Sequence, residues 1–418
     1  MFDPKEDVRI LVFNCGSSSL KYEVFRMPHR LSLGRGLVER IGEDQGRLVQ
    51  QGPQGEVTRK GTIPDHAAAM AWVGTALTAA EAPIVESLSD IHGIGHRVVH
   101  GGEAFSASAV IDERVIHAIE DAAELAPLHN PANLTGIREA ERLIPGLKHV
   151  AVFDTAFHQT MPPSAYLYAI PREFYEKHRI RRYGFHGTSH RYVAARAHEL
   201  LYRVPDNTNL ITCHLGNGAS VTAIEHGRSI DTSMGFTPLE GLVMGTRSGD
   251  IDPAILGYLE ERGYTARELL NILNKKSGLL GLSGISNDLR DLEAAVDQGN
   301  AHAGEALDVY AQKVRKYIGA YAAELVKVDG LVFTGGIGQH GVRMRERICT
   351  RLEHLGIVMD YGLNAQNGSR EGIVSTPWSR TAILVIPTNE ELQIAMDAYL
   401  LLFPFHAGRR QRSTDINL

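Results

Sequence analysis

The stretch Val8-Arg-Ile-Leu-Val-Phe-Asn-Cys-Gly-Ser-Ser-Ser-Leu-Lys-Tyr-Glu-Val-Phe25 consists of two apolar segments on either side of a polar turn. The run Val8–Phe13 and the alternating segment Leu20–Phe25 predict the two strands of a hairpin. The pattern returns about half a chain later, where Leu210–His214 leads through Gly-Asn-Gly into Ala219–Ile224. Two such units predict an internal duplication.

Strand-like and helix-like segments alternate along the rest of the chain, which predicts an α/β fold. Asp112 suits the N-cap of one helix, and Pro131 follows Asn130 in the first turn of the next. No Ser/Gly-rich linker separates the two halves. We therefore expect domain boundaries near Asp154 and Glu390, as the repeat suggests.

Two helices and their neighbouring strands are predicted towards the C-terminus. Strand Leu331–Phe333 follows an apolar stripe made of Val309, Val314, Tyr317, Ile318, Tyr321, Leu325 and Val326. Strand Ala382–Ile386 ends at Pro387, and Thr388-Asn-Glu-Glu391 then has the spacing of a capping box for the last helix.

The composition is that of a globular protein. Its 418 residues are 43% hydrophobic and 22% charged, which excludes disorder and suggests two or three domains. A net charge of -6 argues against nucleic-acid binding, and no apolar run approaches the roughly 18 residues of a membrane span. There are three cysteines, Cys15, Cys213 and Cys349, and this odd number at wide spacings predicts reduced thiols rather than disulfides. We expect a cytoplasmic protein with no nucleic-acid or membrane partner.

Three turns rich in Gly, Ser, Thr and Asn each follow an apolar strand: Asn14–Lys21, His214–Ser220 and Thr334–Gly341. Backbone N–H groups in such turns can converge on phosphate oxygens, since glycine allows a close approach. Any one of these turns alone is more typical of an ordinary connection between strands or between a strand and a helix, and none is a Walker A loop. Their number favours a nucleotide site.

Two arginines lie in segments that ordinarily carry no charge. Arg97 is inside the strand-like run Ile91–His100, and Arg247 is in the glycine-rich segment Gly245–Asp250. A guanidinium in such a place needs an anionic partner, either a substrate or a structural carboxylate. The two alternatives are balanced for Arg97, whereas the small neighbours of Arg247 favour a site.

Histidines spaced four apart raise the alternative of a zinc hydrolase. His96 and His100 lie in a strand pattern, where four residues span about 13 Å, too far for one ion. His186 and His190 lack the Glu of a His-Glu-x-x-His motif, so zinc is the weaker alternative. His186 stands at a predicted helix entry, and both core packing and catalysis remain open for it.

Three acidic residues follow predicted strands or begin predicted helices. Asp154 ends the strand Val150–Phe153, a position from which acids bind metals or orient other groups. Its alternative is a turn or helix cap. Glu390 and Asp288 could likewise be only first-turn acids, which the helix dipole favours.

Seven motifs occur in one order along the chain: Asn14–Lys21, Gly95–Gly102, Phe153–His158, Arg182–His190, His214–Gly218, Gly245–Asp250 and Pro387–Glu390. With them the chain resembles the acetokinase (acetate kinase) family of the acetate and sugar kinase/Hsp70/actin superfamily. The resemblance extends from about Val8 to the helix after Glu390.

The resemblance implies two actin-like (ribonuclease H-like) domains, 1–155 with 391–418 and 156–390, and an active-site cleft between them. It implies a homodimer that transfers the γ-phosphoryl of ATP reversibly to acetate, giving acetyl phosphate and ADP, a step of acetyl-CoA biosynthesis. The implied metal is Mg²⁺, for which Mn²⁺ could substitute. The nearest alternative is a propionate kinase of the same fold, and a more distant one is an ATP-switched binding protein like actin or Hsp70.

Matching motifs implies metal positions at Asn14 and Glu390 and a nucleotide-phosphate position at Lys21. The implied ATP-binding segments are His214-Leu215-Gly216-Asn217-Gly218, Asp288-Leu289-Arg290 and Gly336-Ile337-Gly338-Gln339-His340. The last segment departs from the usual Gly-Ile-Gly-Glu-Asn of the family, which predicts a relaxed nucleotide preference.

The same matching implies that Arg97 binds the substrate and that His186 and Arg247 stabilise the transition state. Asp154 matches the family's proton donor or acceptor. Acetate, like a Glu side chain of pKa about 4.3, is already ionised at neutral pH, so we expect Asp154 to orient Arg247, His186 or a magnesium-bound water. The implied pocket for the acetate methyl group comprises Val99, Leu128, Phe185 and Pro238.

Overall fold

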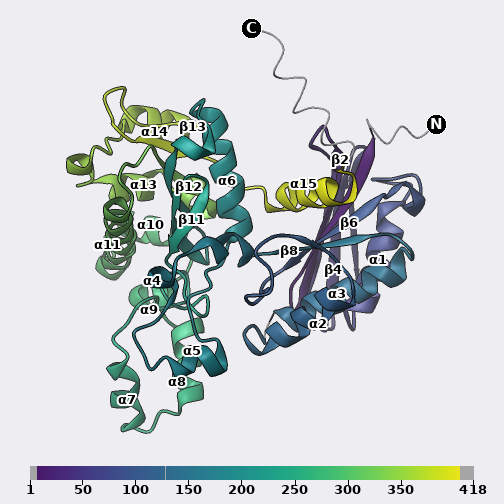
Figure 1. Cartoon of the computed structure of the whole chain (residues 1–418), viewed down its shortest axis with the longest axis horizontal. Coiled ribbons are helices and arrows are strands. Elements are labelled where there is room, and N and C mark those ends of the chain that lie inside the picture. Colours follow the sequence, from purple (N-terminus) through teal and green to yellow (C-terminus); the bar gives the residue numbers. More distant parts are fainter. Residues whose placement is uncertain (1–6, 128, 405–418) are drawn as a thin grey trace. The chain divides into compact units, whose positions relative to one another are not determined.

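The computed structural model describes residues 7–127 and 129–404. Contacts divide the chain into two compact units (Figure 1): unit 1 is the described part of Met1–Ala156 and Asn389–Leu418, and unit 2 is Phe157–Thr388. Within these described ranges, no helix has both the length and the apolar character needed to cross a membrane.

Unit 1 contains one eight-stranded sheet in the order β5-β4-β3-β2-β1-β6-β8-β7. Its strands are β1 (Val8–Cys15), β2 (Ser19–Met27), β3 (Leu31–Glu39), β4 (Gly46–Gly52), β5 (Gly55–Gly61), β6 (Gly93–Val98), β7 (Ala109–Val110) and β8 (His149–Phe153). Its helices are α1 (His66–Leu77), α2 (Glu113–Asp121), α3 (Asn130–Leu143) and α15 (Glu390–Leu402).

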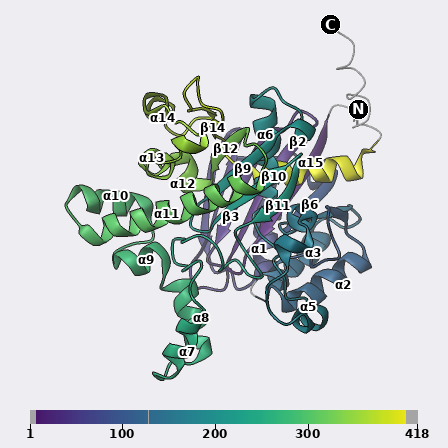
Figure 2. The same cartoon turned by 60° about the vertical axis from the view of Figure 1, so that its left-hand side comes forward.

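Unit 2 contains a six-stranded sheet in the order β11-β10-β9-β12-β14-β13. Its strands are β9 (Asn209–Leu215), β10 (Ala219–Glu225), β11 (Arg228–Thr232), β12 (Gly330–Thr334), β13 (Gly372–Ile373) and β14 (Ala382–Val385). Its helices are α4 (Pro163–Tyr166), α5 (Glu173–His178), α6 (Gly187–Leu200), α7 (Ala254–Glu260), α8 (Ala266–Lys275), α9 (Gly278–Ser283), α10 (Leu289–Asp297), α11 (Ala301–Glu324), α12 (Gly335–His340), α13 (Val342–Cys349) and α14 (Tyr361–Asn367). Figure 2 shows α7 and α8 projecting from the body of this unit.

The two sheets share one arrangement of five strands. In unit 1 the order β3-β2-β1-β6-β8 has two antiparallel pairs followed by two parallel pairs. The order β11-β10-β9-β12-β14 of unit 2 repeats it pair by pair. This repeat confirms the predicted α/β class and supports the predicted duplication. It also places the ends of β1, β6 and β8, like those of β9, β12 and β14, along one edge of each sheet.

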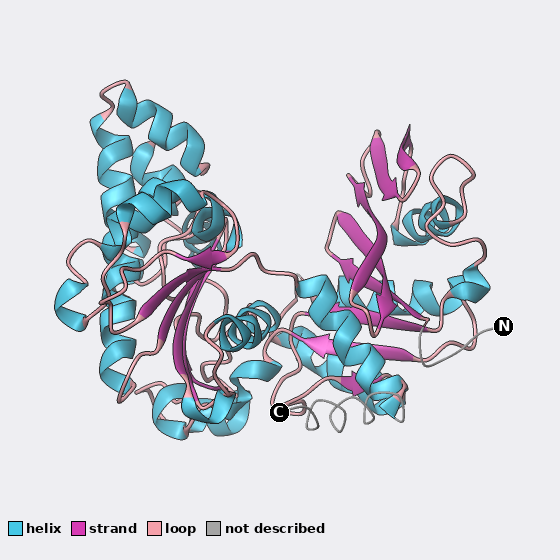
Figure 3. Ribbon diagram, turned by 90° about the horizontal axis from the view of Figure 1, so that it is seen from above, coloured by secondary structure: helices cyan, strands magenta, loops and turns pink. Residues whose placement is uncertain are grey.

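Each sheet is flanked by helices, as Figure 3 shows. In unit 1, Leu11 and Phe13 of β1 share a core with Met70 of α1 and Ala140 of α3. The other face of β1 and β6 packs against α15. In unit 2, α6 covers one face through a shared core, and α11 packs against β9 and β10. Burial on both faces explains why the central strands are continuously apolar rather than alternating.

Most predicted elements are confirmed. Both hairpins form as β1–β2 and β9–β10, the side chain of Asp112 caps α2 by accepting from the N–H of Val115, and Pro131 lies in the first turn of α3. The three cysteines are free thiols.

Two predictions at helix boundaries were wrong. The cap of α15 is Asn389, whose side chain accepts from the N–H of Leu392, rather than Thr388. The apolar stripe is shorter than predicted, because α11 ends at Glu324 and Val326 is 95% exposed. Val309 is also exposed, since five residues of helix rotate it about 140° from Val314.

Candidate active site

Arg97 is the centre of a polar cluster in unit 1. Its Nε and Nη2 donate to Oδ2 of Asp154 at 2.9 and 2.5 Å, and its Nη1 donates to Oδ1 of Asn14 at 3.2 Å. Asn14 is near the end of β1, Arg97 is in β6, and Asp154 follows β8. The parallel pairing of these three strands therefore brings the three side chains together at one edge of the sheet.

Buried charge shifts the ionisation of this cluster. Burial lowers the pKa of Arg97, but the carboxylates of Asp154 and Glu390 raise it further, so that the pKa lies above its ordinary value. Burial raises the pKa of the Glu390 carboxyl to about 7; nearby Arg97 opposes the rise and Asp154 adds to it. Glu390 is the first residue of α15. Arg97 thus stays cationic, and the Glu390 carboxyl gives up its proton less readily than an ordinary glutamate.

Two predicted metal positions and one predicted nucleotide-phosphate position lie around this cluster. Asn14 contacts Arg97, Glu390 influences the pKa of Arg97, and exposed Lys21 pairs across the β1–β2 hairpin with Asn14. An amide oxygen and a carboxylate are the hard oxygen donors that Mg²⁺ prefers, together with water and phosphate oxygens. The donor set therefore fits Mg²⁺. Among residues 7–127 and 129–404, no group of three or more His, Cys, Asp or Glu side chains is placed to hold a metal ion.

Unit 2 contains a cavity of about 600 Å³ at the turns predicted to bind ATP. Its lining comprises Gly216, Asn217, Asn287, Asp288, Leu289, Arg290, Glu293, Gly336, Ile337, His340 and Gly341. Members of all three predicted segments thus surround one space. Others from those segments, namely His214, Leu215, Gly218, Gly338 and Gln339, are not part of the lining, and Lys21 belongs to unit 1.

Local structure explains the shape of this cavity. Gly335 begins α12 with φ +75°, and a Cβ there would lie 2.6 Å from the carbonyl oxygen of Leu215, so the two turns meet only because this residue is glycine. Across the cavity, Asp288 caps α10 and pairs with Arg290 through two bonds of 3.0 and 2.6 Å. Asn287 donates to Oδ1 of Asn217 at 3.0 Å, which links the two sides.

A buried arginine holds the far end of the third segment. Arg345 is fully buried and donates to the carbonyl oxygens of Gly338, Gln339 and Gly368 and to Oδ1 of Asn364, at 2.6 to 3.0 Å. Burial lowers its pKa to about 10. Its donors satisfy carbonyl groups at the end of α12, which otherwise lack partners. Sequence reasoning missed Arg345.

Histidines and hydroxyl groups form a chain beside the Gly216–Gly218 turn. Nδ1 of His186 lies 2.9 Å from Oγ of Ser220, which also lies 2.8 Å from Nε2 of His190. The His186 ring stacks on His214 with 4.2 Å between centroids. Burial is the main cause that lowers the pKa of His190 well below its ordinary value, which keeps that ring neutral. Ser220 and His190 therefore orient the His186 ring, and both were missed as partners of His186.

Arg247 differs from Arg97 in its partners. Its Nη1 donates to the carbonyl oxygen of Pro238 at 3.1 Å and approaches the sulfur of Met244 at 3.8 Å; among the described residues no carboxylate pairs with it. Burial lowers its pKa. A Cβ placed on Gly218 would lie 3.4 Å from Nε2 of His186 and 3.6 Å from Nη1 of Arg247. A half-buried guanidinium without a counter-ion and an imidazole thus converge on one glycine turn, as anion binding requires.

The predicted methyl pocket is placed only in part. Val99 is buried in unit 1, whereas Phe185 is buried and Pro238 half-buried in unit 2. Leu128 lies outside the described residues, as do 405–418 of the predicted first domain. Sequence reasoning did not predict that Glu293 and Asn287 line the cavity. Glu293 could have been predicted, because it follows Leu289 by four residues on α10.

A duplicated α/β sheet, a cavity lined in part by glycines, and a nearby arginine that no described carboxylate neutralises are features expected of a phosphoryl-transfer protein. Residues 9–396 match the Acetokinase family, and the chain belongs to this family. It is 53% identical to the acetate kinase of Desulfitobacterium hafniense (strain DSM 10664 / DCB-2) over 394 residues, 93% of this chain and 98% of that one. It is 52% identical to the acetate kinase of Bacillus subtilis (strain 168) over 94% of this chain and 99% of that one.

Solved structures give the same relationship. A crystal structure of Porphyromonas gingivalis acetate kinase matches with a TM-score of 0.91 and 47% identity, covering 94% of this chain and all of the other. A propionate kinase from Francisella tularensis subsp. tularensis SCHU S4 matches with a TM-score of 0.88 and 42% identity, covering 93% of this chain and 98% of the other.

Proposed function

We propose that the protein is an acetate kinase, which transfers the γ-phosphoryl group of ATP reversibly to acetate and yields acetyl phosphate and ADP. Family membership over nearly the whole chain supports the class of reaction. The observation that carries the site is Arg247, a half-buried guanidinium that meets His186 at the Gly218 turn and pairs with no carboxylate among the described residues.

The proposed reaction uses residues of both units. In unit 2, the 600 Å³ cavity would accept ATP, and Arg247 and His186 would stabilise the charge that develops on the transferred phosphoryl oxygens. In unit 1, Arg97 would bind the acetate carboxylate through the donor capacity that its existing bonds leave. We propose that the domain that binds acetate spans 1–155 with 391–418, and that the domain that binds ATP spans 156–390.

Asp154 has a positioning role in this proposal. Acetate is ionised at neutral pH, so the reaction removes no proton from its nucleophile. Both bonds from Arg97 to Asp154 end on Oδ2, which fixes the plane of the guanidinium. Asp154 thus orients Arg97, a partner that the sequence did not single out. Bound Mg²⁺ would neutralise phosphate charge, and Asn14 and Glu390 would hold it.

Further features are proposed from the family resemblance. They are dependence on Mg²⁺ with Mn²⁺ as a substitute, a homodimeric state and a cytoplasmic location. Light scattering of the purified chain measures the oligomeric state directly, and a monomer would contradict that part.

One assay tests the function. Purified protein is incubated with ATP, Mg²⁺ and hydroxylamine and with either acetate or propionate, and the acyl hydroxamate is measured, with a chelator control. We expect acetyl hydroxamate to form fastest. Because one methylene changes selectivity by only about 1–3 kcal/mol, the match to a propionate kinase makes propionate the second candidate. No hydroxamate from either acid would overturn both.

A further inference from the structure

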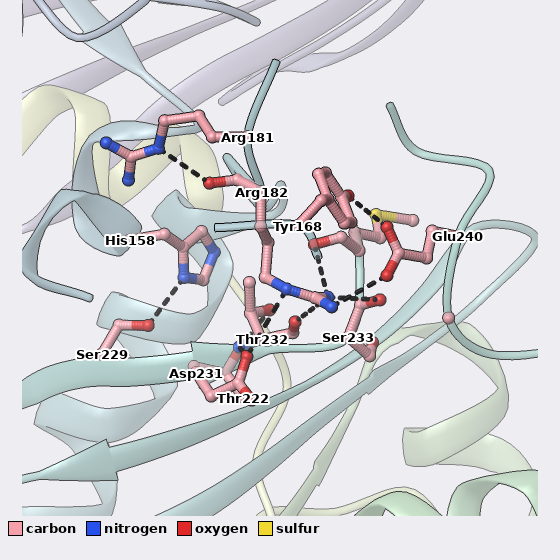
Figure 4. A network of polar contacts seen from close by, with 12 residues as sticks. His158, Tyr168, Arg181, Arg182, Thr222, Ser229, Asp231, Thr232, Ser233 and Glu240 are labelled. Atoms are coloured by element: carbon pink, nitrogen blue, oxygen red, sulfur yellow. Dashed lines mark hydrogen bonds and ion pairs between the residues drawn. The ribbon is translucent and has the colours of Figure 1, made fainter. Parts of the chain in front are cut away.

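Arg182 lies at the centre of a polar network in unit 2, shown in Figure 4. Its side chain is only 17% exposed, and its Nη2 donates to Oε1 of Glu240 at 2.8 Å. Its Nη1 donates to the carbonyl oxygen of Thr232 at 2.7 Å and, less closely, to those of Ser233 and Met234 at 3.3 and 3.4 Å. The Arg182 guanidinium therefore binds both the backbone carbonyl groups at the end of β11 and Glu240, the acidic residue at the end of the following loop.

Tyr168 fixes the same loop from a second side. Its hydroxyl donates to Oε2 of Glu240 and accepts from the backbone N–H of Phe236 at 2.7 Å. A Cβ on Gly235 would lie 1.6 Å from Oε2 of Glu240, so the loop passes directly over the carboxylate. Segment 232–240 is thus held at its start, middle and end.

This segment leads directly to Arg247. The carbonyl oxygen of Pro238, between Phe236 and Glu240, accepts from Nη1 of Arg247 at 3.1 Å. Just beyond the loop, the N–H of Gly241 donates to Oδ1 of Asp250 at 2.7 Å, which anchors its exit. The position of the Pro238 carbonyl, and with it the direction of the Arg247 guanidinium, depends on how firmly segment 232–240 is held.

The positive charge of Arg182 is neutralised by carboxylates of the same unit. Glu240 pairs with it at 2.8 Å and Asp231 lies 3.8 Å from its Nε, whereas no described carboxylate pairs with Arg247. The donors of Arg182 end on Glu240 and on three backbone carbonyl groups, an arrangement that holds the surrounding segment in place.

We propose that Arg182, Glu240 and Tyr168 position Arg247 for catalysis, by holding segment 232–240 so that the Pro238 carbonyl orients its guanidinium. Arg182 acts through Arg247 and touches no substrate. The inference rests on the proposed phosphoryl transfer, and it adds three residues to those that decide the rate of that step.

The test compares Arg182→Lys and Tyr168→Phe, each alone and combined with Arg247→Ala. Misplacing a catalytic group can cost about 10²-fold, so we expect kcat to fall roughly 10- to 100-fold for Arg182→Lys and about tenfold for Tyr168→Phe, with smaller changes in the KM for ATP and acetate. On the Arg247→Ala background neither change should lower kcat further. A matched control is Arg203→Lys. Arg203 pairs with buried Asp329 at 2.8 Å near the N-terminal ends of β9 and β12, opposite the ends that carry the glycine turns, so this change should leave kcat unchanged.

Full additivity on the Arg247→Ala background in folded variants, checked by thermal unfolding, would overturn the inference. A second measurement needs no turnover: phenylglyoxal modification of Arg247, followed by peptide mass spectrometry, should be faster in Tyr168→Phe than in the unaltered protein. If the unaltered protein makes no acetyl phosphate, the proposed function is wrong. If, in addition, Arg247 is modified at the same rate in Tyr168→Phe as in the unaltered protein, the positioning role is wrong as well.

Discussion

Units 1 and 2 share five strands in the same order and direction, yet the same edge of each sheet carries different chemistry. In unit 1, Arg97 is bound to Asp154 and Asn14. In unit 2, Arg247 meets only a carbonyl oxygen and a sulfur among described residues, and the histidines beside it bond to hydroxyl groups. A carboxylate therefore neutralises part of the positive charge of Arg97, whereas no carboxylate among the described residues pairs with Arg247.

The difference follows from what comes after equivalent strands. After β12, unit 2 continues with the glycine segment of α12, which lines the cavity. After β6, the equivalent strand of unit 1, the chain continues with buried Val99 and His100. The same sheet topology thus borders a cavity where the segment after the strand is glycine-rich, and a polar cluster where that segment carries larger side chains.

The largest effect should come from Arg247→Ala, which removes a cation that no carboxylate among the described residues neutralises. Loss of one preorganised donor costs about 10²–10³ in kcat, and steady-state kinetics with acetate and ATP measure it. Free guanidine added to the assay should restore part of the rate. A change confined to the KM for acetate would show that Arg247 binds only the ground state.

Asp154→Asn tests the paired side of the comparison. If Asp154 orients Arg97, kcat/KM for acetate should fall about 10- to 100-fold, because the amide keeps one acceptor oxygen but lacks the carboxylate charge that holds the guanidinium. The apparent affinity for Mg²⁺ should stay unchanged in a metal titration. Wild-type kcat/KM in a folded variant would contradict the positioning role.

Arg345→Lys tests the cavity without touching the arginine cluster. An ammonium group can replace only some of the four bonds that Arg345 makes, so the end of α12 should loosen. We expect the KM for ATP to rise about tenfold while the KM for acetate changes little. Equal rises in both constants would indicate a general loss of structure, which circular dichroism would detect.

The smallest effect is expected from the double variant Gln339→Glu with His340→Asn, which restores the usual family segment. Gln339 points away from the cavity and donates to the carbonyl oxygen of Ser369 at 3.0 Å, whereas His340 lines the cavity. Only one of the two residues can therefore contact a nucleotide, and the ratio of kcat/KM for ATP over GTP should rise by only a few-fold, equivalent to less than about 1.4 kcal/mol. No change in that ratio would remove His340 from nucleotide selection.

The sequence by itself determined the α/β class, the two hairpins and the strand ends at which polar residues gather. It did so because apolar periodicity, turn glycines and caps are local properties that short segments carry. Helix limits were less secure: Val309 and Val326 are apolar but exposed, since nothing local records which face of α11 meets the sheet.

Tertiary structure alone decided which charges are paired. The sequence favoured a site for Arg247 but left a substrate and a structural carboxylate equally open for Arg97. Only the register of β1, β6 and β8 shows that Asp154, 57 residues away, pairs with the Arg97 guanidinium. The anchoring of Arg247 through Pro238, and the buried bonds of Arg345, likewise join residues whose partners no periodicity marks. Ionisation and orientation depend on distance and burial, which exist only once the chain has folded.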